Sequence, residues 1–570
     1  MVLLIKLGYD GPMNSRAYLI LAIFIILILS IALGVATFWI NFWPTDSYFF
    51  YLPTARELFK VEYLSQMHDV LPGTIVMHGK ETLVLGIAIM QKMLNDTQSL
   101  YPNVLLLIIA TAISSLSIYS IGLRIFAPRI AFLCFILFIT SFWSWMYALQ
   151  GAHQPLALMF FLLTVVCLQN TSRHGIFALL AGLCLGFMSF SSPTALLYLP
   201  YFFLFFVFYK NSFQLKKIKH LALATGLFLS GMLAVILLFT FPNPIQSLKE
   251  FSIFLSRSQG FNHFYLYRSQ LSLLDPLHFG TTHSDFFRGA GLIWIIKYFF
   301  LIMPFLFSAY LVSLGYLFQQ GFKKKKILLV IFISLATPWA VEAMQAAQFG
   351  RNYFSWLMGM LFVIGYTAHL RSQKGSFSFQ LKLITGIWIA GHLILNIFVF
   401  FTDIFPTRMA TASLDRYLRK NHIEQLWTYP QNPYKNVTTD VLNNPKLKEK
   451  IQFTPMQTIH DPTEGYVLIP PTSSYVLHNN CIGEDWITDP GLKKLLDQGG
   501  LESYTVTIFP TIGSSRIWTQ EEEVCSYRDL ILGDMAKSRK KSKIYILDVK
   551  KLQSAWEDSL PDTKLRKNPL

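Results

Sequence analysis

The sequence predicts an α-helical polytopic membrane protein with a small α/β domain at its carboxyl end. Of the 570 residues, 53% are hydrophobic and 15% are aromatic, whereas only 14% are charged. Soluble domains of this length rarely combine these proportions. Apolar stretches of roughly 20 residues, the length that crosses the hydrocarbon core, recur along the chain up to about residue 402. Beyond about Thr411 the composition becomes polar.

We expect about eleven transmembrane helices within residues 1–402. The expected spans cover residues 17–43, 103–123, 130–148, 154–169, 175–191, 194–209, 220–241, 290–318, 327–343, 353–370 and 382–402. The first span is too long for the core of a signal peptide and lacks a small-residue cleavage pattern. We therefore expect it to be retained.

Basic residues in short loops predict the orientation, because such residues remain in the cytoplasm. They fall on alternate loops and are Arg16, Arg124, Arg129, Arg173, Lys210, Lys216, Lys217, Lys219, Lys323 to Lys326, Arg371 and Lys374. The amino terminus is therefore expected inside, and eleven spans place residues 403–570 outside. The net charge of +16 reflects this bias and does not imply a nucleic-acid partner.

Two extracytoplasmic loops are long enough to fold, residues 44–102 and 242–289. The first is expected to hold a helix over residues 47–63, with Leu52, Ala55 and Phe59 on one face, and a second helix over residues 81–94. The second loop can cap a cavity at the membrane surface or be an ordinary solvated loop. Its charged and aromatic residues are His263, Tyr265, Tyr267, Arg268, Asp275, His278, His283, Asp285 and Arg288.

The carboxyl domain, residues 403–570, is expected to combine strands and helices. Strands are predicted at residues 465–470, 504–509 and 543–548, and helices at 414–421, 490–498 and 549–557. The domain has no Gly-rich phosphate loop, nucleophile elbow or metal signature, so we expect a binding or structural role. Cys481 and Cys525 can pair in an oxidising compartment, although their spacing alone leaves this open.

A carboxylate directly follows the first span, in the stretch Trp43-Pro44-Thr45-Asp46-Ser47-Tyr48. An acidic residue there lies where lipid-borne substrates meet water. Partial desolvation raises the proton affinity of such a carboxylate and suits it to act as a base. The alternative is that Thr45 or Asp46 caps the following helix, but we favour catalysis.

Four short motifs resemble the GT-C-type glycosyltransferases, the superfamily of the protein O-mannosyltransferases and the bacterial aminoarabinose and undecaprenyl-phosphate-sugar transferases. The motifs are Asp46 with Tyr48 and Tyr51, His78-Gly79-Lys80-Glu81-Thr82-Leu83, Arg124-Ile125-Phe126-Ala127-Pro128-Arg129 and Phe349-Gly350-Arg351-Asn352-Tyr353-Phe354. The resemblance covers roughly residues 17–402. It implies an inverting enzyme of the bacterial inner membrane that moves a sugar from a polyprenyl-phosphate donor to an extracytoplasmic acceptor.

The resemblance also implies roles for individual residues. Asp46 matches the presumed catalytic base, and Arg351 matches a residue beside the lipid phosphate. A departing phosphate needs cationic stabilisation, which Arg351, Lys80 or Arg268 can provide. Arg351 can instead anchor its span at the interface. The remaining expected substrate-binding residues are Tyr48, Tyr51, His78, Gln154 and Tyr353.

The chain departs from the family pattern at the start of the fourth span. The family often has a second carboxylate there, whereas this chain has Gln154, or His153 if the register slips by one. Either Asp46 suffices, or His153 supplies a catalytic group, or the activity is altered or lost. No cofactor is expected with certainty, and a need for a divalent metal ion stays open.

Two other functions remain possible, a transporter or flippase for a lipid-linked solute and a catalytically inactive membrane scaffold. Transporters usually show internal duplication and paired charges at mid-bilayer depth. This chain has no evident duplication, and its main ionisable residues within spans are Lys297, Glu342 and His392. These observations favour the glycosyltransferase.

Overall fold

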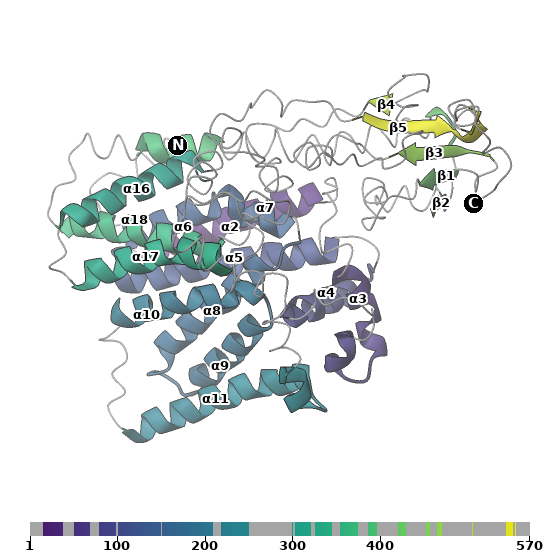
Figure 1. Ribbon diagram of the computed structural model, residues 1–570. Helices are drawn as coiled ribbons and strands as arrows, with labels where there is room; N and C mark the ends of the chain where they lie inside the picture. Colours follow the sequence, from purple (N-terminus) through teal and green to yellow (C-terminus); the bar gives the residue numbers. More distant parts are fainter. Residues whose placement is uncertain are drawn as a thin grey trace. The chain divides into compact units, whose positions relative to one another are not determined.

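The computed structural model describes most of the helical part of the chain and short pieces of the carboxyl part (Figure 1). The described residues are 15–37, 51–68, 79–97, 101–149, 151–208, 218–249, 299, 303–320, 325–344, 354–373, 386–395, 420–423, 425–428, 452–455, 464–469, 504–505, 543–550 and 553–554.

The chain divides into two compact units. The first unit comprises Met1–Phe38, Thr45–Gly280 and Phe287–Phe398. The second comprises Trp39–Pro44, Thr281–Phe286 and Val399–Leu570. The main division at Val399 lies close to the change from apolar to polar composition. The extracytoplasmic location of residues 403–570 stays a prediction.

The described part of the first unit is helical. Its long elements are α2 (Ser15–Thr37), α5 (Tyr101–Ile125), α6 (Pro128–Ile139), α7 (Phe142–Leu149), α8 (Gln154–Asn170), α9 (Ile176–Ser189), α10 (Leu199–Phe208), α11 (Ile218–Thr240), α16 (Pro304–Gln319), α17 (Lys325–Met344) and α18 (Trp356–Gln373). A further helix runs over Gly386–Leu395. The loop between α2 and α5 holds α3 (Leu52–Glu57), the 3₁₀ segments η2 (Leu58–Lys60) and η3 (Leu64–His68), and α4 (Glu81–Leu94).

A described helix overlaps each of the eleven ranges that the sequence predicts as spans. Three described helices are long and apolar enough to cross a membrane, namely Ser15–Gly34, Tyr101–Ile125 and Leu221–Thr240. Helices α6 and α7 meet at a bend of 60° and make a fourth if they are one broken span. Other apolar helices among the described residues have 10 to 17 residues, so the number eleven stays a prediction.

Basic residues gather at one end of the helical unit. Arg124 at the end of α5 donates from Nη2 to Asn170 Oδ1 at the end of α8, over 2.8 Å. Phe126 in the turn after α5 packs on His369 near the end of α18, with ring centroids 5.8 Å apart. We call this the basic end, and the opposite end, where α4 begins, the loop end. The described basic residues at the basic end are Arg16, Arg124, Arg129, Arg173, Lys325, Lys326 and Arg371.

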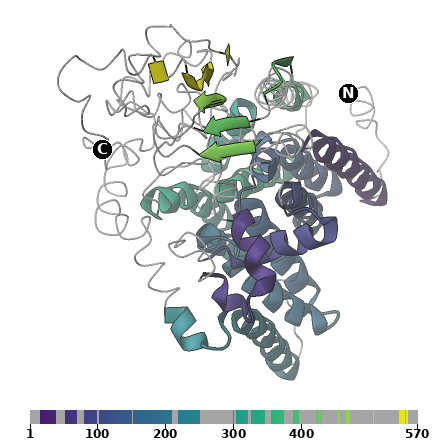
Figure 2. The same ribbon diagram turned by 90° about the vertical axis from the view of Figure 1, so that its right-hand side faces the viewer.

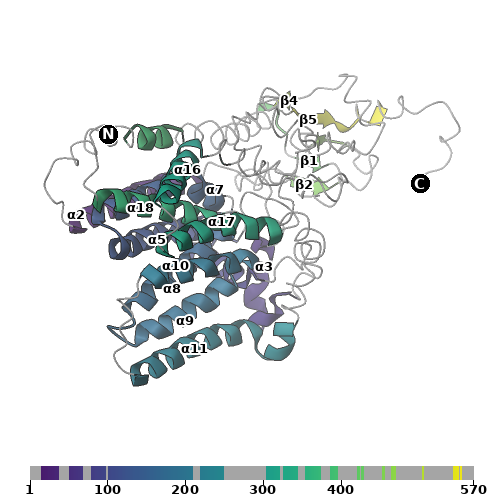
Figure 3. The ribbon, with the colours of Figure 1, turned by 60° about the vertical axis from the view of Figure 1, so that its left-hand side comes forward.

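Helices α8, α9 and α11 lie side by side (Figure 3). Helices α9 and α11 approach so closely that glycine is needed at the contact. A Cβ atom on Gly182 of α9 would collide with the carbonyl oxygen of Phe228, and one on Gly231 of α11 with that of Leu179. Small residues allow membrane helices to pack backbone against backbone. Helix α11 therefore supports α9 along its length.

Aromatic rings fill the space between α7, α16 and α18. The Phe299 ring lies 4.8 Å from Trp143, 4.6 Å from Trp356 and 5.5 Å from Phe307, measured between centroids. Most of these contacts are edge-to-face, the geometry that aromatic pairs prefer. The cluster fixes the loop-end start of α18.

The second unit contains a five-stranded sheet of order β2-β1-β3-β5-β4, whose strands are visible in Figure 2. The strands are β1 (Gln425–Thr428), β2 (Gln452–Pro455), β3 (Tyr466–Ile469), β4 (Tyr504–Thr505) and β5 (Lys543–Asp548). Strand β1 pairs in parallel with β2 and β3, whereas β5 is antiparallel to β3 and β4. Strands β3, β4 and β5 lie where strands were expected, and β1 and β2 were not anticipated. Cys481 and Cys525 lie outside the described residues.

Candidate functional site

The structure describes four of the ten residues that the sequence predicts for the site. Tyr51, Lys80, His153 and Gln154 are described, and all four lie at the loop end. The other six lie outside the described residues, so their roles stay predictions. They are Asp46, Tyr48, His78, Arg268, Arg351 and Tyr353.

The first helix of the loop ends earlier than expected. Helix α3 ends at Glu57 and continues as the 3₁₀ segment η2. Leu52, Ala55 and Leu58 are buried, whereas Phe59 is 55% exposed. A 3₁₀ segment has about three residues per turn, which brings residues three apart onto one face. The prediction that Phe59 shares the buried face is therefore wrong, and Leu58 takes its place.

Helix α4 begins at Glu81 and ends at Leu94, as the sequence predicts. Its start is attached to the loop end of α9. The backbone N–H of Thr82 donates to the carbonyl of Phe190 over 2.9 Å, and its hydroxyl donates to the carbonyl of Phe187 over 3.0 Å. Gly79 just before the helix has a φ of 78°, which glycine adopts without strain. These bonds fix the residues at the start of α4 against the membrane helices.

A buried cation lies at the start of α4. Lys80 is only 7% exposed, and its Nζ lies 5.3 Å from the centre of the Tyr51 ring. The neighbouring Glu81 is 3% exposed. The amino end of a helix carries partial positive charge, which favours Glu81 and disfavours Lys80. The chain therefore holds a lysine where both burial and the helix dipole oppose its charge.

The turn between α7 and α8 presents a second polar pair. Gly151 has a φ of 74°, and its carbonyl accepts a hydrogen bond from Asn103 Nδ2 over 3.3 Å. His153 and Gln154 are buried, and Gln154 Nε2 lies 3.3 Å from His153 Nε2. An amide nitrogen can only donate, so this ring nitrogen accepts. The contact occupies the lone pair that His153 would need in order to act as a base from Nε2.

Orphaned oxygen atoms accompany this pair. Gln154 Oε1 and Asn103 Oδ1 are buried and have no hydrogen-bond partner within the described part of the chain. A buried acceptor without a donor costs free energy, and each such atom calls for an explanation. Hydroxyl groups of a sugar or of an acceptor would satisfy both oxygens. Gln154 thus fits a binding role, as the sequence predicts, better than a catalytic one.

Arg56 ties the two loop helices together. Its Nε donates to the backbone carbonyl of Thr97, just after α4. Burial lowers the pKa of Arg56, and the nearby carboxylates of Asp96 and Glu57 oppose that change. The guanidinium remains charged, because its ordinary pKa is far above neutrality. The contact holds α3, and with it Tyr51, beside α4.

Glu81 and Asn103 were not selected from the sequence. Glu81 belongs to the motif His78-Gly79-Lys80-Glu81-Thr82-Leu83. A carboxylate beside a membrane helix often marks a functional site, so the sequence did contain a signal for this residue. Asn103 gave no such signal, because its importance depends on a contact 48 residues away. Among the described residues, no group of three or more His, Cys, Asp or Glu side chains lies close enough together to hold a metal ion.

Comparison with known proteins gives structural similarity alone. No family model and no curated protein matches the sequence. The structure is similar to the Archaeoglobus fulgidus oligosaccharyltransferase in its apo form, with a TM-score of 0.46 and 11% identity over 87% of this chain and 74% of that one. It is also similar to ArnT from Cupriavidus metallidurans in the apo state, with a TM-score of 0.43 and 9% identity over 92% of this chain and 97% of that one.

A second structure of ArnT, bound to undecaprenyl phosphate, matches with a TM-score of 0.41 and 10% identity over 84% of this chain and 96% of that one. TM-scores this low do not define a common fold. The assignment of a function therefore depends on the residues of this chain.

Proposed function

We propose that the protein is a membrane glycosyltransferase that moves a sugar from a polyprenyl-phosphate donor to a hydroxyl group of an extracytoplasmic acceptor. The observation that carries the proposal is the buried Lys80, held over Tyr51 at the amino end of α4. A cation kept there against the helix dipole suits an anionic ligand. The departing phosphate of the donor is such an anion.

The roles of the residues follow from the chemistry of transfer. The acceptor oxygen attacks the anomeric carbon, its proton passes to a base, and the bond from that carbon to the lipid phosphate breaks. We propose Asp46 as the base and Lys80 and Arg351 as the cations that stabilise the phosphate. Glu81 is the second candidate base. His153, with Nε2 engaged by Gln154, and Gln154 itself are proposed to bind the sugar or the acceptor.

The experiment compares variants in a transfer assay with radiolabelled polyprenyl-phosphate sugars in membranes. Asp46→Asn should lose about 10²-fold or more of turnover, the scale of general-base catalysis. If Asp46 only capped a helix, Asn would replace it well. An active Asp46→Asn variant together with an inactive Glu81→Gln variant would assign the base to Glu81.

Lys80→Met tests the cation, and Lys92→Met is its matched control. Lys92 lies on α4 and also faces an aromatic ring, with its Nζ 5.0 Å from the centre of the Phe59 ring. Unlike Lys80, Lys92 is exposed and lies near the carboxyl end of the helix, where the helix dipole favours a positive charge. Lys80→Met should reduce turnover by about 10²–10³-fold without loss of folded protein, and Lys92→Met should leave turnover unchanged. Equal activity of the two variants would reject the proposal in favour of a scaffold or a transporter. The same conclusion would follow if the unaltered protein transferred sugar from none of the donors.

A further inference from the structure

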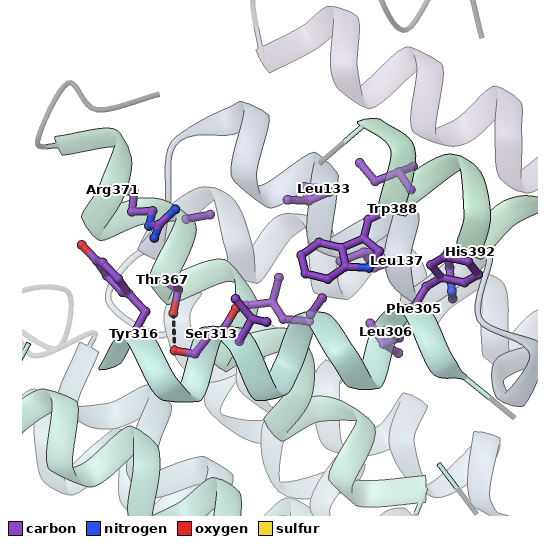
Figure 4. Close-up of a pocket in the computed structure, with 15 residues that line it drawn as sticks. Leu133, Leu137, Phe305, Leu306, Ser313, Tyr316, Thr367, Arg371, Trp388 and His392 are labelled. Carbon is purple, nitrogen blue, oxygen red and sulfur yellow. Dashed lines mark hydrogen bonds between the residues drawn. The ribbon is translucent and has the colours of Figure 1, made fainter. Parts of the chain in front are cut away.

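A cavity lies between α6, α16, α18 and the helix Gly386–Leu395 (Figure 4). Its volume is about 130 Å³, and apolar side chains such as Leu137, Phe305 and Trp388 form most of its lining. None of the described residues of the candidate site, Tyr51, Lys80, His153 and Gln154, lines it. Four helices thus line a partly open hollow apart from the described residues of the candidate site.

The two ends of the cavity differ in chemistry. Arg371 and Tyr316 lie at one end, and Phe305 and His392 lie at the other (Figure 4). The guanidinium carbon of Arg371 is 4.5 Å from the centre of the Tyr316 ring, a cation–π contact at the basic end. His392 is 2% exposed, and its ring donates to the backbone carbonyl of Leu137. The far end is therefore satisfied internally, and the cationic end is where an anion would bind.

The inner lining presents little polarity to a ligand. The Thr367 hydroxyl donates to the Ser313 carbonyl over 3.3 Å and is thereby engaged within the protein. A dry cavity of about 150 Å³ lined by similar side chains binds benzene. A hollow of about 130 Å³ therefore holds roughly five carbons of a hydrocarbon chain.

An arginine beside a tyrosine at a helix end is typical of the headgroup level of a membrane. Clustered basic residues at that level attract anionic lipids, and a set of basic residues lies at the same end as Arg371, namely Arg16, Arg124, Arg129, Arg173, Lys325 and Lys326. We propose that the cavity binds an anionic membrane phospholipid, with the phosphate on Arg371 and the first carbons of one acyl chain between the four helices. A linear acyl chain suits the small volume better than an isoprenoid chain, which carries a methyl branch in every unit.

The experiment measures binding of phosphatidylglycerol to the purified protein in uncharged detergent by native mass spectrometry. Arg371→Ala should weaken binding by about 10- to 100-fold, the value of a hydrogen bond to a charged group. Arg173→Ala is the matched control, because it removes the same charge from an exposed turn at the same end. Arg371→Lys should keep part of the affinity, since the charge remains but the planar fork is lost.

A second pair of variants tests the chain-binding part. Ala309→Phe fills the cavity from α16 and should block binding, whereas Ala222→Phe adds the same volume on the exposed face of α11 and should not. Equal binding by Arg371→Ala and Arg173→Ala would overturn the proposal. So would equal affinity for phosphatidylcholine, or tighter binding of polyprenyl phosphate that depends on the same residues. The inference does not depend on glycosyl transfer and would survive its failure.

Discussion

The contact between α9 and α11 predicts a large difference between two glycines of the same helix. A Cβ atom on Gly231 would collide with the backbone carbonyl of Leu179, which cannot swing aside as a side-chain tip would. A Cβ atom on Gly226 meets no atom within 4 Å. Gly231→Ala and Gly226→Ala therefore make the same chemical change on one helix, and only one of them forces the helices apart.

The expected difference in the free energy of unfolding between the two variants follows from two terms. Replacing glycine by alanine within a helix is favourable by about 0.8–1.0 kcal/mol, and this term is common to both variants. Overpacking costs typically 1–3 kcal/mol and applies to Gly231 alone. The free energy of unfolding of Gly231→Ala should thus lie about 1–3 kcal/mol below that of Gly226→Ala. The measurement is titration of the detergent-solubilised protein with a denaturing detergent, followed by tryptophan fluorescence.

The double variant Gly182→Ala with Gly231→Ala provides a second test of this contact. Gly182→Ala on α9 creates a collision with the Phe228 carbonyl in the same contact. Once the helices have moved apart for one methyl group, the second costs less, so the double variant with Gly231→Ala should lose less than the sum of the single losses. Equal stability of Gly231→Ala and Gly226→Ala, within about 0.5 kcal/mol, would show that α9 and α11 do not pack backbone against backbone.

Two further predictions concern residues outside the described part of the chain. Arg351→Lys should weaken donor binding by about tenfold, because an ammonium cannot make the bidentate contact of a guanidinium. The measurement is the affinity for the donor. If the donor affinity of Arg351→Ala stays within about twofold of that of the original protein, Arg351 is a membrane anchor. A cysteine at Lys324 should react with an impermeant thiol reagent only from the cytoplasmic side, and one at Asn432 only from the outer side; the reverse pattern would contradict the orientation.

Local signals in the sequence were sufficient for the second loop helix. Gly79 precedes helix α4, and a mainly apolar run follows Glu81. The structure gives the helix the predicted limits. The first loop helix shows where such signals end. Its switch to a 3₁₀ segment places Leu58 inside and Phe59 outside, and that choice depends on packing against elements that periodicity does not reveal.

Strands β1 and β2 escaped prediction for a related reason. Each has only four residues, and they pair in parallel with Gln425 opposite Gln452. Parallel neighbours need a long connection, so nothing close to β1 in the sequence identifies its partner. The contact of Lys80 with Tyr51 is likewise non-local. The sequence selected both residues through a resemblance, and only the structure places one over the other.

Polar groups buried in the bundle are of two kinds, those with a hydrogen-bond partner and those without one among the described residues. Within α5, the hydroxyls of Thr111, Ser114 and Ser115 each donate to a carbonyl four residues earlier, over 2.7–2.9 Å. Such local bonds satisfy a hydroxyl inside a membrane helix and require no ligand.

Several buried polar atoms at the loop end are of the other kind, as are the side-chain amide atoms of Gln169 at the basic end. Asn103 Oδ1, Gln154 Oε1 and Ser355 Oγ have no hydrogen-bond partner within the described residues. Lys80 is held against the dipole of its own helix. Proteins break such local rules chiefly where function requires it. Under the proposed function, the hydroxyl groups of a phosphate-linked sugar would donate to such acceptors, and its phosphate would face the Lys80 cation.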